Sequence, residues 1–250
     1  MRNCSLPLYL AWSDIRQRYR RSSLGPFWIT ISTAVMISCI GLIFGGLFKA
    51  PMVEFLPFLT AGLILWGFVS TTIIDATTVF VASESVIKQL PIPIFTHVIR
   101  IVARNFYIFL HNLVIFPFVL FIVGCPLTTV SLCSLVGLTI LIINLLWISL
   151  LLGIICTRFR DLTQIVASVL QIFFYITPII WLPSLLTSRA SVMLLEPNPF
   201  YHLIELVRAP LLGRFPSLNN WSITILIAVI GWIFTISIFG KYRKRIAYWL

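Results

Sequence analysis

The sequence predicts an all-α membrane protein with six transmembrane helices, and its uncharged runs are the main reason. Of the 250 residues, 60% are hydrophobic and only 10% are charged. Five uncharged runs lie at Phe27–Phe48, Phe55–Ile74, Asn105–Thr157, Leu162–Ser188 and Phe215–Gly240. A helix needs about 20 apolar residues to cross the hydrocarbon core. The third run is long enough for two spans, and Gly124-Cys125-Pro126 divides it with a tight turn.

The positive charge predicts how these spans are oriented. Six spans put both termini on one side of the membrane. Four of the 18 Lys and Arg residues fall on the opposite side, namely Lys49, Arg189, Arg208 and Arg214, and the remaining fourteen share the side of the termini. The positive-inside rule makes that side cytoplasmic. The net charge of +11 therefore sets topology and suits anionic lipid headgroups, which argues against nucleic-acid binding.

These runs and their connections make one membrane domain over residues 1–250. The predicted elements are an interfacial helix at 5–22, spans at 27–48, 55–82, 105–123, 127–156, 162–184 and 219–240, a cytoplasmic segment at 83–95 and an extracytoplasmic region at 185–218. A basic run, Lys241–Arg245, follows the last span and is typical of an anchor at the cytoplasmic surface.

The first element has the pattern of a helix that lies in the membrane interface. Its apolar stripe consists of Leu8, Trp12, Ile15 and Tyr19, at helical spacing. The rest of its surface carries the arginines Arg16, Arg18, Arg20 and Arg21. Such a helix turns its apolar residues to lipid and its arginines to phosphates. Gly25-Pro26 then ends the helix and turns the chain into the membrane.

The segment after the second span predicts a short helix at the cytoplasmic surface. Ser83 can cap it, and Glu84 suits its positive N-terminal end. Pro91 and Pro93 prevent its continuation. A short rigid helix at this place could transmit force from a partner, or it could be a simple connector.

The region between the fifth and sixth spans predicts a second short helix. Thr177-Pro178 and Leu182-Pro183 break the preceding span. Asn198 is placed as an N-cap, Pro199 as the first helical residue and Gly213 as the stop. The apolar stripe of this helix consists of Phe200, Leu203, Ile204, Val207 and Leu211. We expect a re-entrant hairpin that caps a pathway from outside; the alternative is a surface helix facing lipid.

Catalytic patterns are missing from the sequence. It has no G-x-x-x-x-G-K-[ST] phosphate loop, no H-E-x-x-H pair for a metal and no G-x-S-x-G elbow. Its five cysteines form no C-x-x-C pair. The chain is therefore expected to be a pathway without its own cofactor or metal. An ion-coupled carrier needs buried carboxylates or histidines, for which only Asp75 and His111 are candidates.

Five segments in register along the whole chain share a pattern with a known family. They are Arg18–Trp28, Phe58–Ser70, Ser83–Phe95, Arg158–Asp161 and Glu196–Gly213. Together they resemble the type 2 ABC transporter permeases that export O-antigen, teichoic acid and capsule-like polysaccharides. Pro93 departs from the family pattern, in which a basic residue soon follows the first proline.

The resemblance implies a homodimer in the bacterial inner membrane with two copies of a separate ATPase subunit. ATP-Mg would bind to that partner, and this chain would be a transport subunit rather than an enzyme. The implied substrate is an undecaprenyl-linked polysaccharide. Among these, O-antigen for lipopolysaccharide biosynthesis is the first choice. Contact with the ATPase would use Glu84, Ser85, Val86, Ile87, Lys88, Gln89 and Leu90.

The other expected site residues follow from the needs of a lipid-linked sugar chain. Aromatic surfaces suit sugars, and the candidates for a channel lining are Phe27, Trp28, Phe173, Phe174, Tyr175 and Trp181. Arginine forks suit a lipid pyrophosphate, for which Arg16, Arg18, Arg20 and Arg21 are the candidates. The outer gate would use Asn198, Pro199, Phe200, Tyr201, Glu205 and Arg208. The alternatives are an ABC permease for a drug or small lipid and a multi-pass membrane transferase.

Overall fold

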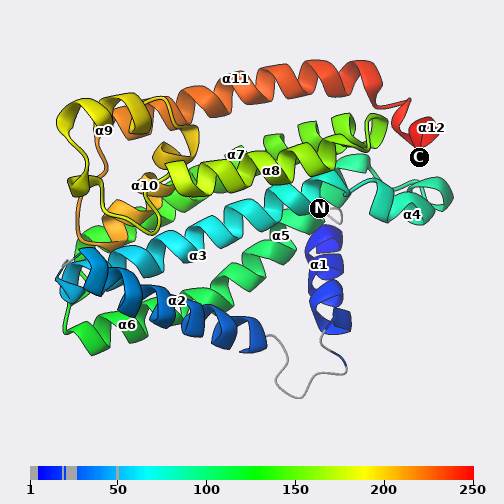
Figure 1. The fold of residues 1–250 in the computed structure, drawn as a ribbon. Coiled ribbons are helices and arrows are strands. Elements are labelled where there is room, and N and C mark those ends of the chain that lie inside the picture. The colour runs from blue at the N-terminus through cyan, green and yellow to red at the C-terminus, as the bar shows by residue number, and fades with distance from the viewer. Residues whose placement is uncertain (1–4, 19, 21–26, 49–50) are drawn as a thin grey trace.

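The computed structural model describes residues 5–18, 20, 27–48 and 51–250, and every regular element within them is a helix. Those long and apolar enough to cross a membrane are α2 (Phe27–Phe48), α3 (Met52–Thr77), the broken helix formed by α5 (Ile94–Leu113) and α6 (Ile115–Val123), α7 (Cys133–Arg158) and α11 (Leu218–Tyr242). Helix α8 (Leu162–Ile176) is apolar but shorter. The helices run lengthwise beside one another (Figure 1). The chain is therefore an all-α, multi-pass membrane protein.

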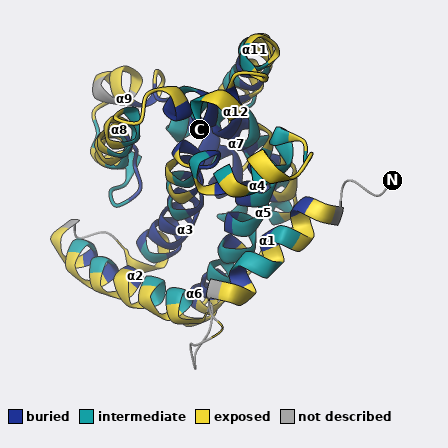
Figure 2. Ribbon diagram, turned by 90° about the vertical axis from the view of Figure 1, so that its right-hand side faces the viewer, coloured by how far each residue is buried: buried dark blue, intermediate teal, exposed yellow. Residues whose placement is uncertain are grey.

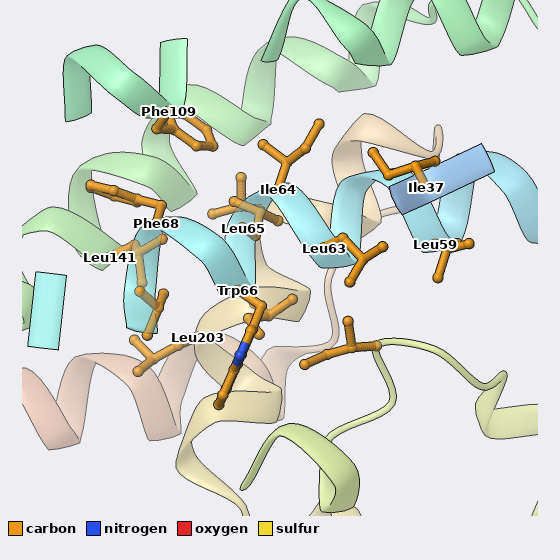
Figure 3. Packing of buried hydrophobic residues seen from close by; sticks show 14 of the residues in the cluster. Ile37, Leu59, Leu63, Ile64, Leu65, Trp66, Phe68, Phe109, Leu141 and Leu203 are labelled. Atoms are coloured by element: carbon orange, nitrogen blue, oxygen red, sulfur yellow. The ribbon is translucent and has the colours of Figure 1, made fainter. Parts of the chain in front are cut away.

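Helix α3 is the centre of the bundle. It contacts α2, α5, α6, α7, α8 and α10, and most of its residues are buried (Figure 2). Its apolar side chains pack against Phe109 of α5, Leu141 of α7 and Leu203 of α10 (Figure 3). Two buried hydroxyls of α3 bond to the helix's own backbone. Thr60 donates to the Leu56 carbonyl at 2.7 Å and Thr72 to the Phe68 carbonyl at 2.6 Å.

Glycines bring α7 close to its neighbours. A Cβ atom on Gly231 of α11 would overlap the Trp147 ring of α7. A Cβ atom on Gly137 of α7 would overlap the Leu206 carbonyl oxygen of α10. Glycine is therefore required at both positions. Membrane helices commonly pack closely at small residues. In lipid there is no hydrophobic driving force between helices, so their association depends on close van der Waals packing.

Two membrane helices begin earlier than the charge pattern predicts. Helix α3 begins at Met52 and ends at Thr77, whereas the prediction was 55–82. Helix α5 begins at Ile94, directly after Pro93, whereas the prediction was 105. Arg100 and Arg104 lie inside α5, where carboxylates of α1 and α3 pair with them. Charged residues within membrane helices commonly pair with one another in this way.

The third and fourth spans meet at the turn that the sequence predicts. Helix α6 ends at Val123, and Gly124 has the left-handed φ of 77° that favours glycine at a helix end. A short 3-10 helix, η2 (Thr129–Leu132), leads into α7, which continues to Arg158 where the predicted span was 127–156.

Helix α8 stops at Ile176, well before residue 184 where the predicted span ends. Thr177 precedes Pro178 and is extended (φ −77°, ψ 134°), as the proline ring requires of the residue before it. The chain then passes through η3 (Pro183–Leu185) and α9 (Ser188–Leu195) to α10 (Pro199–Leu211). The continuous helix is therefore shorter than the apolar run from which the span was predicted.

The two ends of the bundle differ in what they carry (Figure 1). One end, which we call the α4 end, holds α1 (Ser5–Arg18), η1 (Val81–Ser83), α4 (Glu84–Gln89) and α12 (Ile246–Trp249). The opposite end, which we call the α10 end, holds α9 and α10. Helix α11 begins after Ser217, whose hydroxyl accepts from the Asn220 backbone N–H at 3.2 Å, where the predicted span was 219–240. Helix α12, after the basic run, was not predicted.

Helix α1 does not present its faces as predicted. Leu8 and Trp12 are exposed, as expected of lipid-facing residues, but Ile15 is buried. The face that packs on α5 consists of Pro7, Ala11 and Ile15. Asp14, on the same side, forms ion pairs with α5 and so fixes the rotation of α1. Tyr19 and Gly25-Pro26 lie outside the described residues, as does part of the predicted 5–22 helix.

Candidate functional site

Helix α8 carries a polar stripe that the bundle leaves uncovered. Gln164, Ser168, Gln171 and Tyr175 recur at spacings of four, three and four residues, so they share one face, and all four are exposed. The side chains that bury α8 lie on another face, with Leu170 and the half-buried Phe173 and Phe174. Exposed amides and hydroxyls are unfavourable against lipid tails. This stripe is therefore suited to a polar ligand or to another protein chain.

The half of α3 nearest the α4 end has a similar exposed surface. Thr71, Ile74 and Thr78 are exposed there, and Ser70 is half-buried. Beside it, a cavity of about 310 Å³ lies between α2, α3 and α5. The polar residues of its lining are Thr33, Thr71, Asp75, Asn105 and Asn112.

This cavity combines the groups that bind sugars elsewhere in proteins. The aromatic rings of Phe68 and Phe109 contribute to its wall. The Asn112 side-chain oxygen is buried and has no hydrogen-bond partner among the described residues. Buried amides normally have partners, so an unpaired one beside a cavity favours a polar ligand. The cavity is therefore suited to a ligand with both polar and apolar surfaces.

An ion-pair network closes the α4 end of this cavity. Asp14 of α1 accepts from the Arg100 Nε of α5 at 2.7 Å, and Asp75 of α3 accepts from Arg104 Nη2 of α5 at 2.7 Å. The Asn105 amide also donates to Asp75 at 2.9 Å. The network joins three helices. Asp75 is thus held in a neutralised pair, which is the situation of a structural carboxylate rather than a proton relay.

His111 has a packing role in the structure. Its Nδ1 donates to the Tyr107 carbonyl at 2.7 Å, one helical turn earlier on α5. Its ring makes an edge contact with Phe27 of α2, with the ring centroids 6.1 Å apart. His111 and Asp75 therefore do not form the pair that an ion-coupled carrier would require.

The predicted coupling segment is a discrete helix at the α4 end. Helix α4 covers Glu84–Gln89, and Leu90 follows it in an extended conformation before Pro91. The Ser83 hydroxyl makes no capping hydrogen bond, contrary to the prediction. Lys88 instead donates to Glu84 at 2.6 Å across one turn, and this hydrogen bond lowers the pKa of Glu84.

One side of α4 is packed and the other is free. Ile87 packs on a buried cluster that includes Val79, Phe80 and Ile246. Val86 is half-buried. The exposed surface of the segment consists of Ser85, Lys88, Gln89 and Leu90. A movement of α4 would thus pass directly to α5, α7 and the residues that follow α3, which contribute to the same cluster.

Aromatic rings gather at the α10 end. Phe200 of α10 lies between Phe173 of α8 and Trp66 of α3, with ring centroids 4.8 and 5.6 Å away. Trp66 also contacts Phe174 at 5.8 Å, and Phe174 contacts Tyr175 at 5.4 Å. The Trp181 indole N–H donates to the Tyr175 carbonyl at 3.1 Å, and Tyr201 is half-buried beside His202.

The predicted aromatic lining is therefore not one continuous surface. Phe173, Phe174, Tyr175 and Trp181 come together at the α10 end. Phe27 and Trp28 are more than half exposed and lie at the start of α2, where Phe27 contacts His111 of α5. Among the described residues, no ring contact joins the two groups.

Helix α10 begins where the sequence predicts. The Asn198 side-chain oxygen accepts from the backbone N–H groups of Phe200 and Tyr201, which confirms the N-cap with Pro199 as the first helical residue. Its amide group donates to the Thr177 hydroxyl at 2.9 Å. Gly213 has a φ of 77°, which confirms the predicted stop. Asn198 therefore ties the start of α10 to the end of α8.

Arg208 is completely buried inside this end of the bundle. Its Nε donates to Glu205 at 2.9 Å, and its Nη1 donates to the Pro178 carbonyl at 2.5 Å. Its guanidinium carbon lies 3.9 Å from the centre of the Phe58 ring of α3. The ion pair, the carbonyl and the ring together hold α10 against α3 and the chain after α8. Helix α10 also packs against α7, α3 and α11, and most of its residues are buried.

The predicted headgroup arginines are only partly described. Arg16 is exposed on α1, and Arg20 is exposed in the turn that follows. Arg18 ends α1, but its side chain and Arg21 lie outside what the structure describes. Asp14, Trp66 and the polar stripe of α8 were not predicted as site residues. The stripe could have been predicted from the spacing of its polar residues, which recur after four, three and four positions. Asp14 and Trp66 could not, because the residues that they contact are distant in sequence.

Known proteins resemble this chain over most of its length. A family model described as "ABC-2 type transporter" matches residues 8–212. Two relatives from Klebsiella pneumoniae, each named O-antigen export system permease protein RfbA, are 23% and 24% identical to it. Both alignments cover 94% of this chain and 90% of the relative.

Proposed function

Because this chain belongs to the ABC-2 type transporter family, we propose that it is the permease subunit of an ABC exporter for lipid-linked polysaccharide, of the O-antigen type. The observation that carries the proposal is the similarity, over nearly the whole chain, to permeases named for O-antigen export. The substrate in this proposal is linked to undecaprenyl and crosses the bacterial inner membrane outward. Both termini, and with them the α4 end, would be cytoplasmic.

The polar surfaces of α3 and α8 support a sugar chain as the substrate. Sugars require hydroxyl and amide partners with aromatic faces, and these groups line the cavity beside Asn112 and the stripe through Gln171. A path for a drug or a small lipid would be expected to be more apolar. In a homodimer, the exposed stripes of two copies would face a shared channel and be removed from lipid, which lowers the cost of exposing them.

The energy for export would come from two copies of a separate ATPase subunit that binds ATP-Mg. Its contact with this chain would be α4, through the exposed surface from Ser85 to Leu90. Closure of the two ATPases would push α4, and the cluster around Ile87 would pass the movement to the membrane helices as rigid bodies. The arginines of α1, including Arg16, would meet the lipid pyrophosphate at the cytoplasmic interface.

Co-expression with candidate ATPases tests the transporter assignment. We expect purification to yield a complex of two permease chains and two ATPases, in which ATP hydrolysis depends on the permease. A permease that associates with no ATPase and changes the hydrolysis rate of none would contradict the proposal.

A matched pair of serine variants tests the pathway. Ser168 of α8 and Ser237 of α11 are both exposed, and each hydroxyl bonds to its own helix backbone. Only Ser168 lies on the polar stripe. Ser168→Leu should lower the amount of surface polysaccharide in cells that depend on this permease, and Ser237→Leu should not. Equal effects of the two variants, with equal amounts of complex, would argue against a path along α8.

A further inference from the structure

A second pocket lies at the α4 end, outside the surfaces assigned to sugar and ATPase. It has a volume of about 360 Å³ and is enclosed by the ends of α7 and α11 and by α12. Two arginines contribute to it, Arg158 from the end of α7 and Arg245 from the start of α12. Nothing in the proposed export cycle uses this pocket.

The charge of this pocket is not neutralised. Within the described part of the chain, neither Arg158 nor Arg245 forms an ion pair, and Asp161 is not within ion-pairing distance of either. Lys88, Arg100 and Arg104, by contrast, each pair with a carboxylate. Two unpaired guanidinium groups that share one pocket are suited to a phosphate, which their planar forks can bind through paired hydrogen bonds.

The fold holds one of these arginines in position. The Arg158 guanidinium lies 5.4 Å from the centre of the Trp249 ring and 5.9 Å from that of Phe159. Trp249 in turn packs on Tyr242, with the ring centroids 5.5 Å apart. Helix α12 is itself anchored, because Ile246 is completely buried in the cluster beneath it. The pocket is therefore a formed feature of the bundle.

The rest of the lining is apolar and runs toward the membrane. Ile154 and Ile155 lie about one turn before Arg158 on α7, and Ile238 lies one turn before Tyr242 on α11. Tyrosine and tryptophan are enriched at the level of lipid headgroups. A ligand that satisfies both parts of the pocket needs an anionic head and a hydrocarbon tail.

We propose that this pocket binds one anionic phospholipid of the surrounding membrane. Arg158 and Arg245 hold its phosphate, and its acyl chain lies along Ile154 and Ile238. Helix α12 also contacts α4, so the bound lipid sits beside the helix assigned to ATPase contact. The site does not depend on which substrate the transporter exports.

Native mass spectrometry of the full-length chain tests the site. The chain, purified in detergent, is titrated with phosphatidylglycerol and, separately, with phosphatidylcholine. The double variant Arg158→Gln, Arg245→Gln should retain phosphatidylglycerol at least about tenfold more weakly than the parent. The matched control is Arg243→Gln, Lys244→Gln, which removes the same charge from neighbouring exposed positions outside the pocket and should change retention by less than about twofold.

Several results would overturn the proposal. Equal losses in the two double variants would indicate diffuse attraction to the basic segment. Equal retention of phosphatidylcholine would indicate an apolar groove without headgroup recognition. Displacement of the lipid by millimolar inorganic phosphate would assign the site to free phosphate, and displacement by an associated ATPase would assign it to the protein interface.

A fluorescence measurement covers the case in which the double variant fails to fold. Phosphatidylglycerol with a brominated acyl chain should quench the parent protein more than the Trp249→Phe variant, because Trp249 lines the pocket. Equal quenching of the two proteins would contradict a lipid at this position.

Discussion

Replacing Arg208 with methionine should destabilise the bundle strongly, because it leaves Glu205 without its cation at a nearly closed site. Methionine has a shorter, unbranched apolar side chain, and it removes every hydrogen bond to Glu205 and to the Pro178 carbonyl. Removing one partner of a buried ion pair costs about 3–5 kcal/mol. The Glu205 side chain is 21% exposed and can recover some hydration, so the lower limit of about 3 kcal/mol applies.

That loss can be measured as thermal unfolding in detergent. For a chain of this size, a change of 1 kcal/mol shifts Tm by about 2–4 °C, so Arg208→Met should lower Tm by about 6–12 °C. The double variant Arg208→Met, Glu205→Gln should recover part of the loss, because the unpaired charge is then absent. A Tm within about 2 °C of the parent for Arg208→Met, or a double variant less stable than the single one, would refute this account of the buried pair.

Three further variants test the helix contacts. Asp14→Asn should loosen α1 and raise proteolysis after this helix, since it removes the ion pair that orients α1; protection equal to the parent's would contradict this. Gly231→Val should lower Tm by several degrees, because its side chain would occupy the place of the Trp147 ring, whereas Gly240→Val, with open space around it, is the control. Reversing the charge of Glu84 should uncouple ATP hydrolysis from export with little effect on Tm, and full coupling in this variant would place the ATPase contact elsewhere.

The membrane fold could be predicted from the sequence where local chemistry decides the structure. Asn198, Pro199 and Gly213 have conformations that their own residue types favour, and the structure has α10 between them. Gly124 likewise ends α6 at the predicted turn. In these places the signal lies within a few residues, so it can be read without knowledge of the tertiary contacts.

The errors arose where distant residues decide the structure. Helix α5 begins at Ile94 and contains Arg100, which pairs with Asp14, 86 residues earlier in the chain. No periodic pattern reveals such a pair. Ile15 was assigned to lipid for the same reason, since only the contact of Asp14 with α5 fixes how α1 is rotated. The candidate site was predicted least completely because its cavity is formed by residues from three helices.

The hydroxyls of α3 that bond to the helix's own backbone have a consequence for membrane insertion. Helix α3 is synthesised before α7 and α10, the helices that later cover it, so it must first reside in lipid without them. Thr60 and Thr72 bond to carbonyls of the same helix and need no later partner. Helix α3 can therefore insert into the bilayer as an independent segment before the helices that later cover it are synthesised.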